Sequence, residues 1–444
     1  MATVIATLLG LVVILGLSGL AFLTLFALWR QRRREGAARV EHSHAVLVGA
    51  QPVSLHPKVD LGRCIGSGTC VEVCPEKDVL AVLDGKAQIV NPTACIGHGE
   101  CLRACPVDAI ALVLGSERRG VEIPLVSREF ETNVPGLYVV GELGGMGLIY
   151  NATVQALQAM SAIGKNPPPV TPGVLQVLIV GAGPAGLAAS LKGKQLGLAC
   201  ETVDQETVGG TILQYPRQKI AMTRPVELPL YGRLWMSEVS KEALLETWNG
   251  ILAKTQLEVR SGVKVEGIVR RSDGVFDVAT SAGPIRAHRV VLALGRRGSP
   301  RKLGIPGEEL AKVTYRLLEP ERYTGNRVLV VGGGDSAVEA AIALGQAKAK
   351  VTLSYRGTAF DRIKKKNQER LDAAVALGRI ELLLGSAPIE IAEREVIVDV
   401  SGMRSAIAND YVMVFAGGVL PTKFLEAAGV QVATFKGEAY APAN

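Results

Sequence analysis

The chain has 444 residues, 48% of them hydrophobic, with 50 glycines and a formal net charge of +7. This length allows two or three domains with their own cores. Six of the seven cysteines lie in two clusters at metal-binding spacing, which excludes a disulfide-stapled secreted protein and favours a reducing compartment. Five arginines and Glu35 between Arg30 and Arg39 supply +4 of the charge, which is typical of a cluster flanking a membrane and not of a nucleic-acid surface.

The first 29 residues contain no Asp, Glu, Lys or Arg. A helix of this length spans roughly 40 Å, more than the ~30 Å hydrocarbon core of a bilayer. A cleaved signal peptide is the alternative, but no basic region precedes the apolar run and no small-residue cleavage site follows it. With Trp29 and the following arginines as interfacial anchors, the sequence predicts a transmembrane helix over 3–29 and a single-pass membrane protein whose bulk is cytoplasmic.

A polar, basic tether over 30–57 leads to the segment 58–115, which contains two cysteine motifs. The second motif is a repeat of the first, offset by 31 residues, and each motif ends in Cys-Pro. Bacterial two-cluster ferredoxins carry C-x2-C-x2-C-x3-C-P twice. Here the second cysteine of each run is replaced, by Ser67 and by His98. We therefore expect a small α+β dicluster-ferredoxin-like domain with three thiolates per cluster.

In such ferredoxins the last cysteine of each run binds the other cluster. The predicted ligand sets are Cys64, Cys70 and Cys105 with Ser67 at the fourth corner, and Cys74, Cys95 and Cys101 with His98 there. Three thiolates suit a 3Fe-4S cluster, or a 4Fe-4S cluster whose last iron takes an oxygen or imidazole ligand, so up to two clusters are expected. A decayed fold that binds nothing is the alternative, but random decay would lose ligands unevenly. Whether His98 is a ligand or a plain loop histidine stays open.

Between the two motifs, apolar residues predict short strands over 79–83 and 88–90, joined by an Asp84-Gly85 turn. Further along, 132–141 has the pattern of a strand that ends in a glycine turn, and a helix is expected over 151–163. The Pro-rich stretch 166–174 then breaks the chain.

The remainder repeats the order of strand, glycine turn and helix twice. The glycine turns contain Gly181, Gly183 and Gly186 in the first repeat, and Gly332 and Gly334 with Ser336 and Ala337 in the second. Both match G-x-G-x-x-G/A in the required strand-to-helix context, where backbone N–H groups at the start of the helix can approach a pyrophosphate. Two Rossmann-like nucleotide-binding domains are predicted.

The two repeats differ where nucleotide specificity is set. Asp204 ends the second strand of the first repeat, where an acidic side chain accepts hydrogen bonds from ribose hydroxyls. The second repeat has no acid there; it has Ser354-Tyr355-Arg356-Gly357, with Arg362 close behind. Arginine favours a 2′-phosphate, so NADPH is expected in preference to NADH. The alternative is that Arg356 is a solvated surface residue.

From about 175 to 432 the chain resembles the low-molecular-weight, thioredoxin-reductase-like family of two-domain flavoproteins. Besides the two glycine motifs, the resemblance rests on Gly209-Gly210, Ala293-Leu-Gly295 and Ala416-Gly-Gly418. It implies that the first motif, with Gly210, binds FAD, and that the second, inserted unit binds NADPH. It also implies hydride transfer from nicotinamide C4 to flavin N5, with the protein aligning the two cofactors.

The sequence departs from that family in its thiols. The family's reductases carry a C-x-x-C pair just before the second glycine motif, whereas 313–319 contains no cysteine. A disulfide reductase needs such a pair for thiol exchange, so a thiol–disulfide reductase is disfavoured. The branch that resembles ferredoxin–NADP reductases lacks the pair too.

A second departure concerns the order of the segments. Thr132–Gly141 resembles the family's late motif that closes the FAD domain, with Glu142 in place of an aspartate, yet here it precedes the first glycine motif. We interpret this as a circularly permuted FAD domain, which closely spaced termini allow. The predicted parts are a closing segment 116–165, a linker 166–174, an FAD-binding domain 175–300 with 406–444, and an NADP-binding domain 301–405.

Together these features predict a membrane-anchored NAD(P)H-dependent oxidoreductase that passes electrons between NADPH, FAD and ferredoxin-type clusters. Its acceptor would be a ferredoxin-like protein, a quinone or a membrane redox partner, and reverse flow is equally allowed. No residue stands out as a general acid or base. A homodimer stays open. The alternative function is a non-catalytic redox or nucleotide sensor with degenerate clusters.

Overall fold

The computed structural model describes residues 2–47, 49–52, 55–95, 97–117, 120–144, 148–214, 220–222, 225–236, 238–295, 299–360 and 363–439, without the side chains of 2–14, 214, 220–222, 238, 299 and 439. The chain divides into two compact units, of which the first comprises Met1–Gln51 and Pro57–Ala111 and the second Pro52–His56 and Leu112–Asn444.

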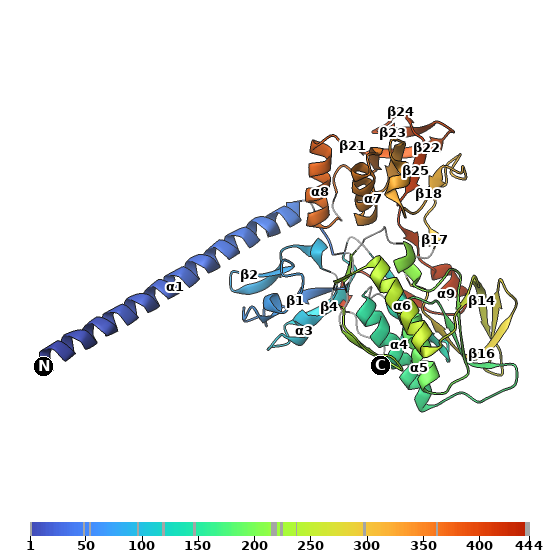
Figure 1. Cartoon of the computed structure of the whole chain (residues 1–444), viewed down its shortest axis with the longest axis horizontal. Helices are drawn as coiled ribbons and strands as arrows, with labels where there is room; N and C mark the ends of the chain where they lie inside the picture. The colour runs from blue at the N-terminus through green and yellow to red at the C-terminus, as the bar shows by residue number, and fades with distance from the viewer. Residues whose placement is uncertain are drawn as a thin grey trace. The chain divides into compact units, whose positions relative to one another are not determined.

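The first unit begins with one uninterrupted helix, α1 (Ala2–Leu47), which continues through most of the predicted tether (Figure 1). Within the described part of the chain, no helix has a stretch long and apolar enough to cross a membrane. The predicted transmembrane helix over 3–29 and the single-pass membrane localisation are therefore wrong.

The remainder of this unit is built around a hairpin of β2 (Leu80–Leu83) and β3 (Lys86–Ile89). Asp84 and Gly85 both have positive φ, 50° and 71°, as a type I′ turn requires, so the predicted strands and turn are confirmed. Arg39 of α1 forms an ion pair with Asp84 at this turn. The other elements of this region are β1 (His56–Val59), α2 (Thr69–Glu72), η1 (Pro92–Ala94), α3 (Glu100–Arg103) and β4 (Ile110–Leu114).

The second unit contains a seven-stranded sheet. Its strands are β6 (Leu137–Val139), β7 (Leu175–Val180), β8 (Cys200–Asp204), β13 (Arg260–Ser261), β14 (Val265–Arg270), β15 (Phe276–Thr280) and β16 (Ile285–Leu292). Strands β13, β8, β7 and β16 follow one another in parallel. On its other edge β16 pairs in parallel with β6 and antiparallel with β15, which pairs with β14. The sheet is Rossmann-like, as predicted.

Local sequence explains why these elements form. Five of the six residues of β7 are buried, as expected for a central parallel strand covered on both faces. Helix α5 (Pro184–Gln195) begins with proline, whose fixed φ and missing N–H suit the first helical position. Helix α6 (Lys241–Thr255) is capped by Ser240, whose side chain accepts a hydrogen bond from the Ala243 N–H.

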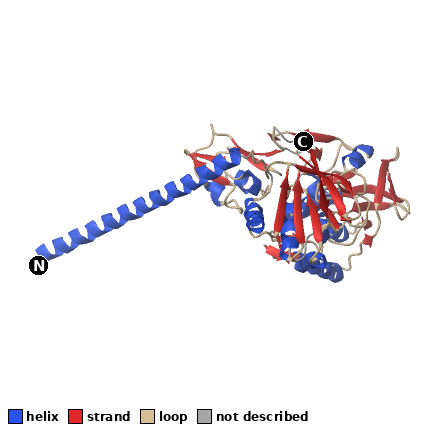
Figure 2. Ribbon diagram, turned by 90° about the horizontal axis from the view of Figure 1, so that it is seen from above, coloured by secondary structure: helices blue, strands red, loops and turns tan. Residues whose placement is uncertain are grey.

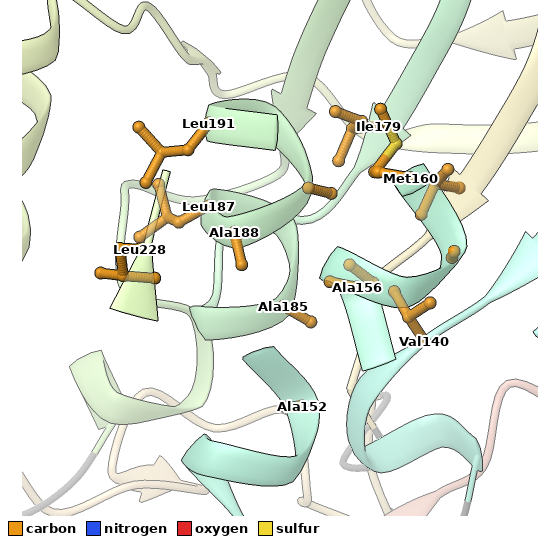
Figure 3. Packing of buried hydrophobic residues seen from close by; sticks show 14 of the residues in the cluster. Val140, Ala152, Ala156, Met160, Ile179, Ala185, Leu187, Ala188, Leu191 and Leu228 are labelled. Atoms are coloured by element: carbon orange, nitrogen blue, oxygen red, sulfur yellow. The ribbon is translucent and has the colours of Figure 1, made fainter. Parts of the chain in front are cut away.

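Helix α4 (Ile149–Lys165), which lies in the predicted closing segment, packs against α5 in one apolar core. Figure 3 shows Met160 of α4 beside Ile179 of β7, and Ala156 facing the small side chains of α5. Met160 and Ala156 are both fully buried. The segment before the first glycine motif therefore contributes a strand, β6, and a helix, α4, to the fold that follows it. The exact domain boundaries stay a prediction.

A second parallel sheet has the strand order β18, β25, β19, β20, β21. Its elements are β18 (Val313–Thr314), β19 (Arg327–Val331), α7 (Asp335–Gln346), β20 (Lys350–Tyr355), α8 (Lys365–Ala376), β21 (Ile380–Leu384) and β25 (Tyr411–Val414). An antiparallel sheet of β22 (Ser386–Ile391), β23 (Glu395–Val400) and β24 (Met403–Ala408) shares an apolar core with it. Figure 2 distinguishes the helices of the chain (blue) from its strands (red).

Shorter elements complete the second unit. They are β5 (Val121–Pro124), η2 (Gly141–Gly144), η3 (Gly210–Gln214), β9 (Ile220–Met222), β10 (Val226–Leu228), β11 (Gly232–Leu234), β12 (Glu238–Ser240), β17 (Ser299–Pro300), η4 (Pro320–Tyr323), β26 (Gly418–Val419), α9 (Thr422–Ala427), β27 (Val432–Phe435) and β28 (Glu438–Ala439). Strand β17 pairs with β26. Strand β27 pairs with β5, so late residues of the chain pair with the predicted closing segment.

Replacing Met160 by alanine tests whether α4 is part of the core. Because Met160 is fully buried against α5, we expect M160A to lower the free energy of unfolding by about 2–5 kcal/mol. Val154, on the same helix, is 37% exposed, so V154A should change it by less than about 0.5 kcal/mol. Urea unfolding followed by tryptophan fluorescence measures both, and equal midpoints for the two variants would contradict the packing of α4.

Candidate functional site

Six of the seven cysteines lie in the first unit, and all of them are free thiols. Cys70 lies in α2 and Cys101 in α3, and each helix is preceded by a glycine in the left-handed region, Gly68 and Gly99. Both cysteines are buried. The repeated geometry follows from the repeated sequence and brings a pair of cysteine loops into one small unit.

The pKa shifts of the thiols show which cysteines are neighbours. Burial raises the pKa of Cys70, and the nearby Cys64 and Cys105 raise it further. Burial also raises the pKa of Cys101 to about 12, with smaller contributions from Cys95, Cys74 and Cys70. The neighbours thus fall mainly into the two predicted sets, each with two cysteines from one motif and the last from the other.

The spacing of these thiols is typical of iron–sulfur clusters, in which each thiolate binds a different iron. Among the described residues, no three His, Cys, Asp or Glu side chains converge on one metal ion. Backbone N–H groups donate to sulfur at two sites, from Ala87 to Cys64 Sγ (3.4 Å) and from Ala109 to Cys105 Sγ (3.2 Å). Such bonds stabilise negative charge on cluster thiolates.

The predicted fourth ligands lie in the same two loops. Ser67 is exposed, and its Oγ accepts a hydrogen bond from Thr69 Oγ1 at 3.2 Å. His98 is half-buried, and its carbonyl accepts from Arg103 at 3.4 Å. Both therefore stay predicted ligands. Lys86, in contrast, was not predicted: its ammonium donates to the Cys64 carbonyl at 2.6 Å, which places a positive charge beside the first set.

The first glycine motif links β7 to α5. Gly181 has φ +107°, and a Cβ there would meet the Ala293 carbonyl at 2.5 Å. A Cβ on Gly186 would lie 1.7 Å from the Gly181 carbonyl. Only glycine fits either position, because backbone approaches backbone. The turn leaves the first N–H groups of α5 free of helical partners, as pyrophosphate binding requires.

Gly183 and Gly210 face each other across this loop. A Cβ built on Gly210 would lie 3.1 Å from Gly183 Cα, and the Gly209 N–H donates to the Ala182 carbonyl at 3.0 Å. Asp204, 9% exposed, accepts from the Ala182 N–H at 2.6 Å. The structure thus brings Asp204 and Gly210 to the first glycine loop, and the exposed backbone of these glycines suits the pyrophosphate of FAD.

Gly141 and Glu142 also lie beside the first motif. A Cβ on Gly141, whose φ is +81°, would meet Ala185 Cβ at 3.1 Å, and its N–H donates to Gln155 Oε1 at 2.8 Å. Glu142 is half-buried in η2. Gln155 was not predicted; it is 3% exposed, and its Nε2 has no hydrogen-bond partner among the described residues. Gln155 could have been found in the sequence as a polar residue on the apolar face of the predicted helix.

The second motif has the same close approach of backbone to backbone. Gly332 has φ +150°, and a Cβ there would lie 2.5 Å from the Phe415 carbonyl. Gly334 is the N-cap of α7, with open space at its Cβ position, and Ser336 is exposed in the first turn. Arg356 is exposed and makes no ion pair within the described residues. Arg362 lies outside the described residues.

A cavity of about 900 Å³ lies elsewhere in this region. Its lining includes Arg327, Lys350 and Asn409. Arg327 and Lys350 are the first residues of β19 and β20, and Asn409 precedes β25. The glycine loop follows the carboxyl end of β19, so this cavity is at the opposite edge of the sheet and is not part of the nucleotide site.

Comparisons with known proteins agree with both parts of the molecule. Residues 178–442 match the family model described as pyridine nucleotide-disulphide oxidoreductase, and residues 56–106 match a 4Fe-4S dicluster domain.

Two curated relatives are similar to more than half of this chain. The bacilliredoxin reductase Bdr of Bacillus subtilis is 27% identical over 263 residues, which cover 58% of this chain and 81% of the relative. The ferredoxin–NADP reductase of Ignicoccus hospitalis is 29% identical over 258 residues, 54% of this chain and 76% of the relative. Among solved structures, the bacillithiol disulfide reductase Bdr of Staphylococcus aureus has a TM-score of 0.52 at 26% identity, covering 57% of this chain and 80% of that one.

Removing one thiolate should affect one cluster. We expect C101A to lower the iron and sulfide content of the anaerobically purified chain to roughly half, because Cys101 belongs to one of the two sets. Cys200, whose pKa burial raises to about 12, lies outside both sets, so C200A should keep the full content. Iron and sulfide assays with EPR spectroscopy check this, and an unchanged content in C101A would remove Cys101 from the ligands.

The first glycine loop can be tested with a matched pair of variants. G186A places a methyl group 1.7 Å from the Gly181 carbonyl, so we expect bound FAD to fall at least tenfold. Gly250 in α6 has nothing within 4 Å of a Cβ, and G250A should bind FAD normally. Absorbance of bound flavin after gel filtration measures both, and normal flavin in G186A would exclude this loop as the FAD site.

Proposed function

Because the chain belongs to the pyridine nucleotide-disulphide oxidoreductase family and a 4Fe-4S dicluster domain precedes the matched region, we propose that it moves electrons between NADPH and a ferredoxin-like protein, through FAD and its own iron–sulfur clusters. That it is a flavin-dependent pyridine nucleotide oxidoreductase follows from the family. The choice of NADPH, the number of clusters and the acceptor are the proposal.

The observation that carries the proposal is the distribution of thiols. The second unit contains one cysteine, Cys200, and a Cβ on Gly193 would meet its sulfur at 2.6 Å, so it is packed between elements of the core. Disulfide exchange needs an attacking and a resolving thiol, which this unit does not supply. The two sets of thiols in the first unit are the remaining redox groups of the chain.

The segment that would carry a thiol pair in the reductases this chain resembles has a different role here. Arg316 in that segment forms a 4.0 Å ion pair with Glu206, two residues beyond Asp204. This supports a segment that contacts the FAD-binding part of the unit through charge and not through thiol chemistry. One of the relatives is a ferredoxin–NADP reductase, which supports a ferredoxin-like acceptor.

Each cofactor has a set of residues on this chain. The Gly181 loop and Asp204 would hold the FAD pyrophosphate and ribose, and Gly332 with Arg356 would hold NADPH. When bound, the flavin supplies the two-electron to one-electron chemistry that links a nicotinamide to iron–sulfur clusters. The chain's own residues orient the cofactors, and exposed Arg356 offers charge to a 2′-phosphate.

The experiment is anaerobic purification of the full chain, with iron, sulfide and flavin assays, followed by NADPH oxidation with a bacterial ferredoxin or with a two-electron dye as acceptor. We expect both acceptors to be reduced. C101A should lose at least tenfold in ferredoxin reduction and keep dye reduction, because the dye can take electrons at the flavin.

Other outcomes separate the alternatives. A chain that binds NADPH but reduces neither acceptor is the non-catalytic sensor. A chain without iron that still reduces the dye would be a simple flavin reductase, and the cluster route would be excluded.

A further inference from the structure

The cavity of about 900 Å³ in the second unit lies at the amino ends of β19 and β20. This volume falls within the range of about 300–1,000 Å³ that is usual for small-molecule pockets. Arg327 and Val331 are the first and last residues of β19, and a strand of this length spans roughly 13 Å. A molecule bound in the cavity would therefore be separated by the length of the strand from the second glycine loop, which follows Val331.

Positive charge predominates in the lining of this cavity. Within the part of the chain that the structure describes, four basic residues and one acidic residue line it. Arg327 is paired with Asp410, whose carboxylate oxygens lie 2.7 Å from its Nη2 and 3.2 Å from its Nε. The acidic residue, Glu381, accepts a hydrogen bond from Thr352 Oγ1 at 3.1 Å. The basic residues that form no ion pair with any described residue are Lys348, Lys350 and Arg379. A cavity lined mainly by one sign of charge concentrates solutes of the opposite sign.

These cations are not needed to close the helices that precede them. Lys348 follows α7 and Arg379 follows α8, and a cation in such a place can serve the partial negative charge of a helix C-terminus. Here the backbone already closes both ends: the Ala349 N–H donates to the Leu344 carbonyl at 3.0 Å, and the Arg379 N–H donates to the Ala374 carbonyl at 2.9 Å. Both basic side chains are exposed, so they are available to a molecule that enters the cavity.

Asn409 adds a buried hydrogen-bond donor to this lining. The residue is only 1% exposed, and its Oδ1 accepts a hydrogen bond from Lys312 Nζ at 2.6 Å. Because an ammonium group can only donate, this contact fixes the orientation of the amide and leaves Nδ2 as the remaining donor. Nδ2 has no hydrogen-bond partner among the described residues. A buried donor without a partner is unfavourable, and an acceptor oxygen in the cavity would provide one.

We propose that this cavity is a second binding site of the chain, for a small phosphorylated molecule held by Lys348, Lys350, Arg379 and Asn409 Nδ2. The donors come from separate segments of the chain, and a phosphoryl group has three strong acceptor oxygens that can meet donors from several directions. A carboxylate offers only two oxygens in one plane. The site lies at the opposite edge of the sheet from the second glycine loop, so its ligand does not compete with the nucleotide. The proposal does not depend on the proposed function.

The test is isothermal titration calorimetry of inorganic pyrophosphate into the full-length holoprotein, with and without saturating NADP⁺. We expect the wild type to bind the probe equally in both conditions, and K350E and R379E each to raise its dissociation constant at least about tenfold. N409D keeps an acceptor for Lys312 but puts a carboxylate oxygen in place of the free donor, so it should weaken binding similarly. K264E makes the same charge change at an exposed lysine that does not line the cavity, and its constant should stay within about twofold.

Other outcomes overturn the site or its ligand class. A wild type that does not bind pyrophosphate, or K350E and R379E that bind it as the wild type does, excludes the cavity. Binding that disappears with NADP⁺ places the probe at a glycine loop instead. Citrate bound as tightly as pyrophosphate would replace the phosphorylated ligand by a polycarboxylate. Thermal unfolding followed by circular dichroism checks each variant. Should N409D fail to fold, K350E and R379E decide, because both replace exposed side chains.

Discussion

Pairing along strand β16 is the constraint on which the rest of the second unit depends. One edge of β16 pairs with β7, the strand of the first glycine motif, and the other is shared by β15 and β6. The backbone groups of Val290 to Leu292 are buried in the core, and buried N–H and C=O groups must find partners. Strand β6, which comes before the first glycine motif in the sequence, provides those partners. The sheet is therefore incomplete without the segment that precedes the first glycine motif.

The same strand organises the binding edge. The Ala293 carbonyl, directly after β16, closes on Gly181, and the Val140 N–H, directly after β6, donates to the Leu292 carbonyl at 3.0 Å. Gly141 follows and lies against Ala185 of α5. Three segments that are far apart in the sequence thus meet at the carboxyl ends of adjacent parallel strands, where nucleotides bind in such sheets. The glycines are needed because backbone meets backbone at this edge.

In the first unit, burial acts on the cysteine thiols by raising their pKa values. Burial raises the pKa of Cys95 to about 11 and of Cys101 to about 12, so bare thiolates would be unfavourable there. Bound iron offsets that cost, since the thiolate is then the ligand of a cation. Lys86 donates to the Cys64 carbonyl beside the first predicted set, and Arg103 donates to the His98 carbonyl in the second.

The sequence alone determined the features whose chemistry is local. Glycine spacing in a strand-to-helix context predicted both loops, and cysteine spacing with the crossover rule predicted both thiol sets, because a short motif contains its own geometry. Hydropathy over 3–29 predicted a membrane helix, and that prediction is wrong, because no helix in the described part of the chain is long and apolar enough to cross a membrane. Only the tertiary structure showed that Tyr355 holds, beside the second glycine loop, the place that Asp204 holds beside the first, and brought Gln155 against Gly141. Those relations depend on which residues face each other across strands and helices, and that register is decided by the packing of the whole core.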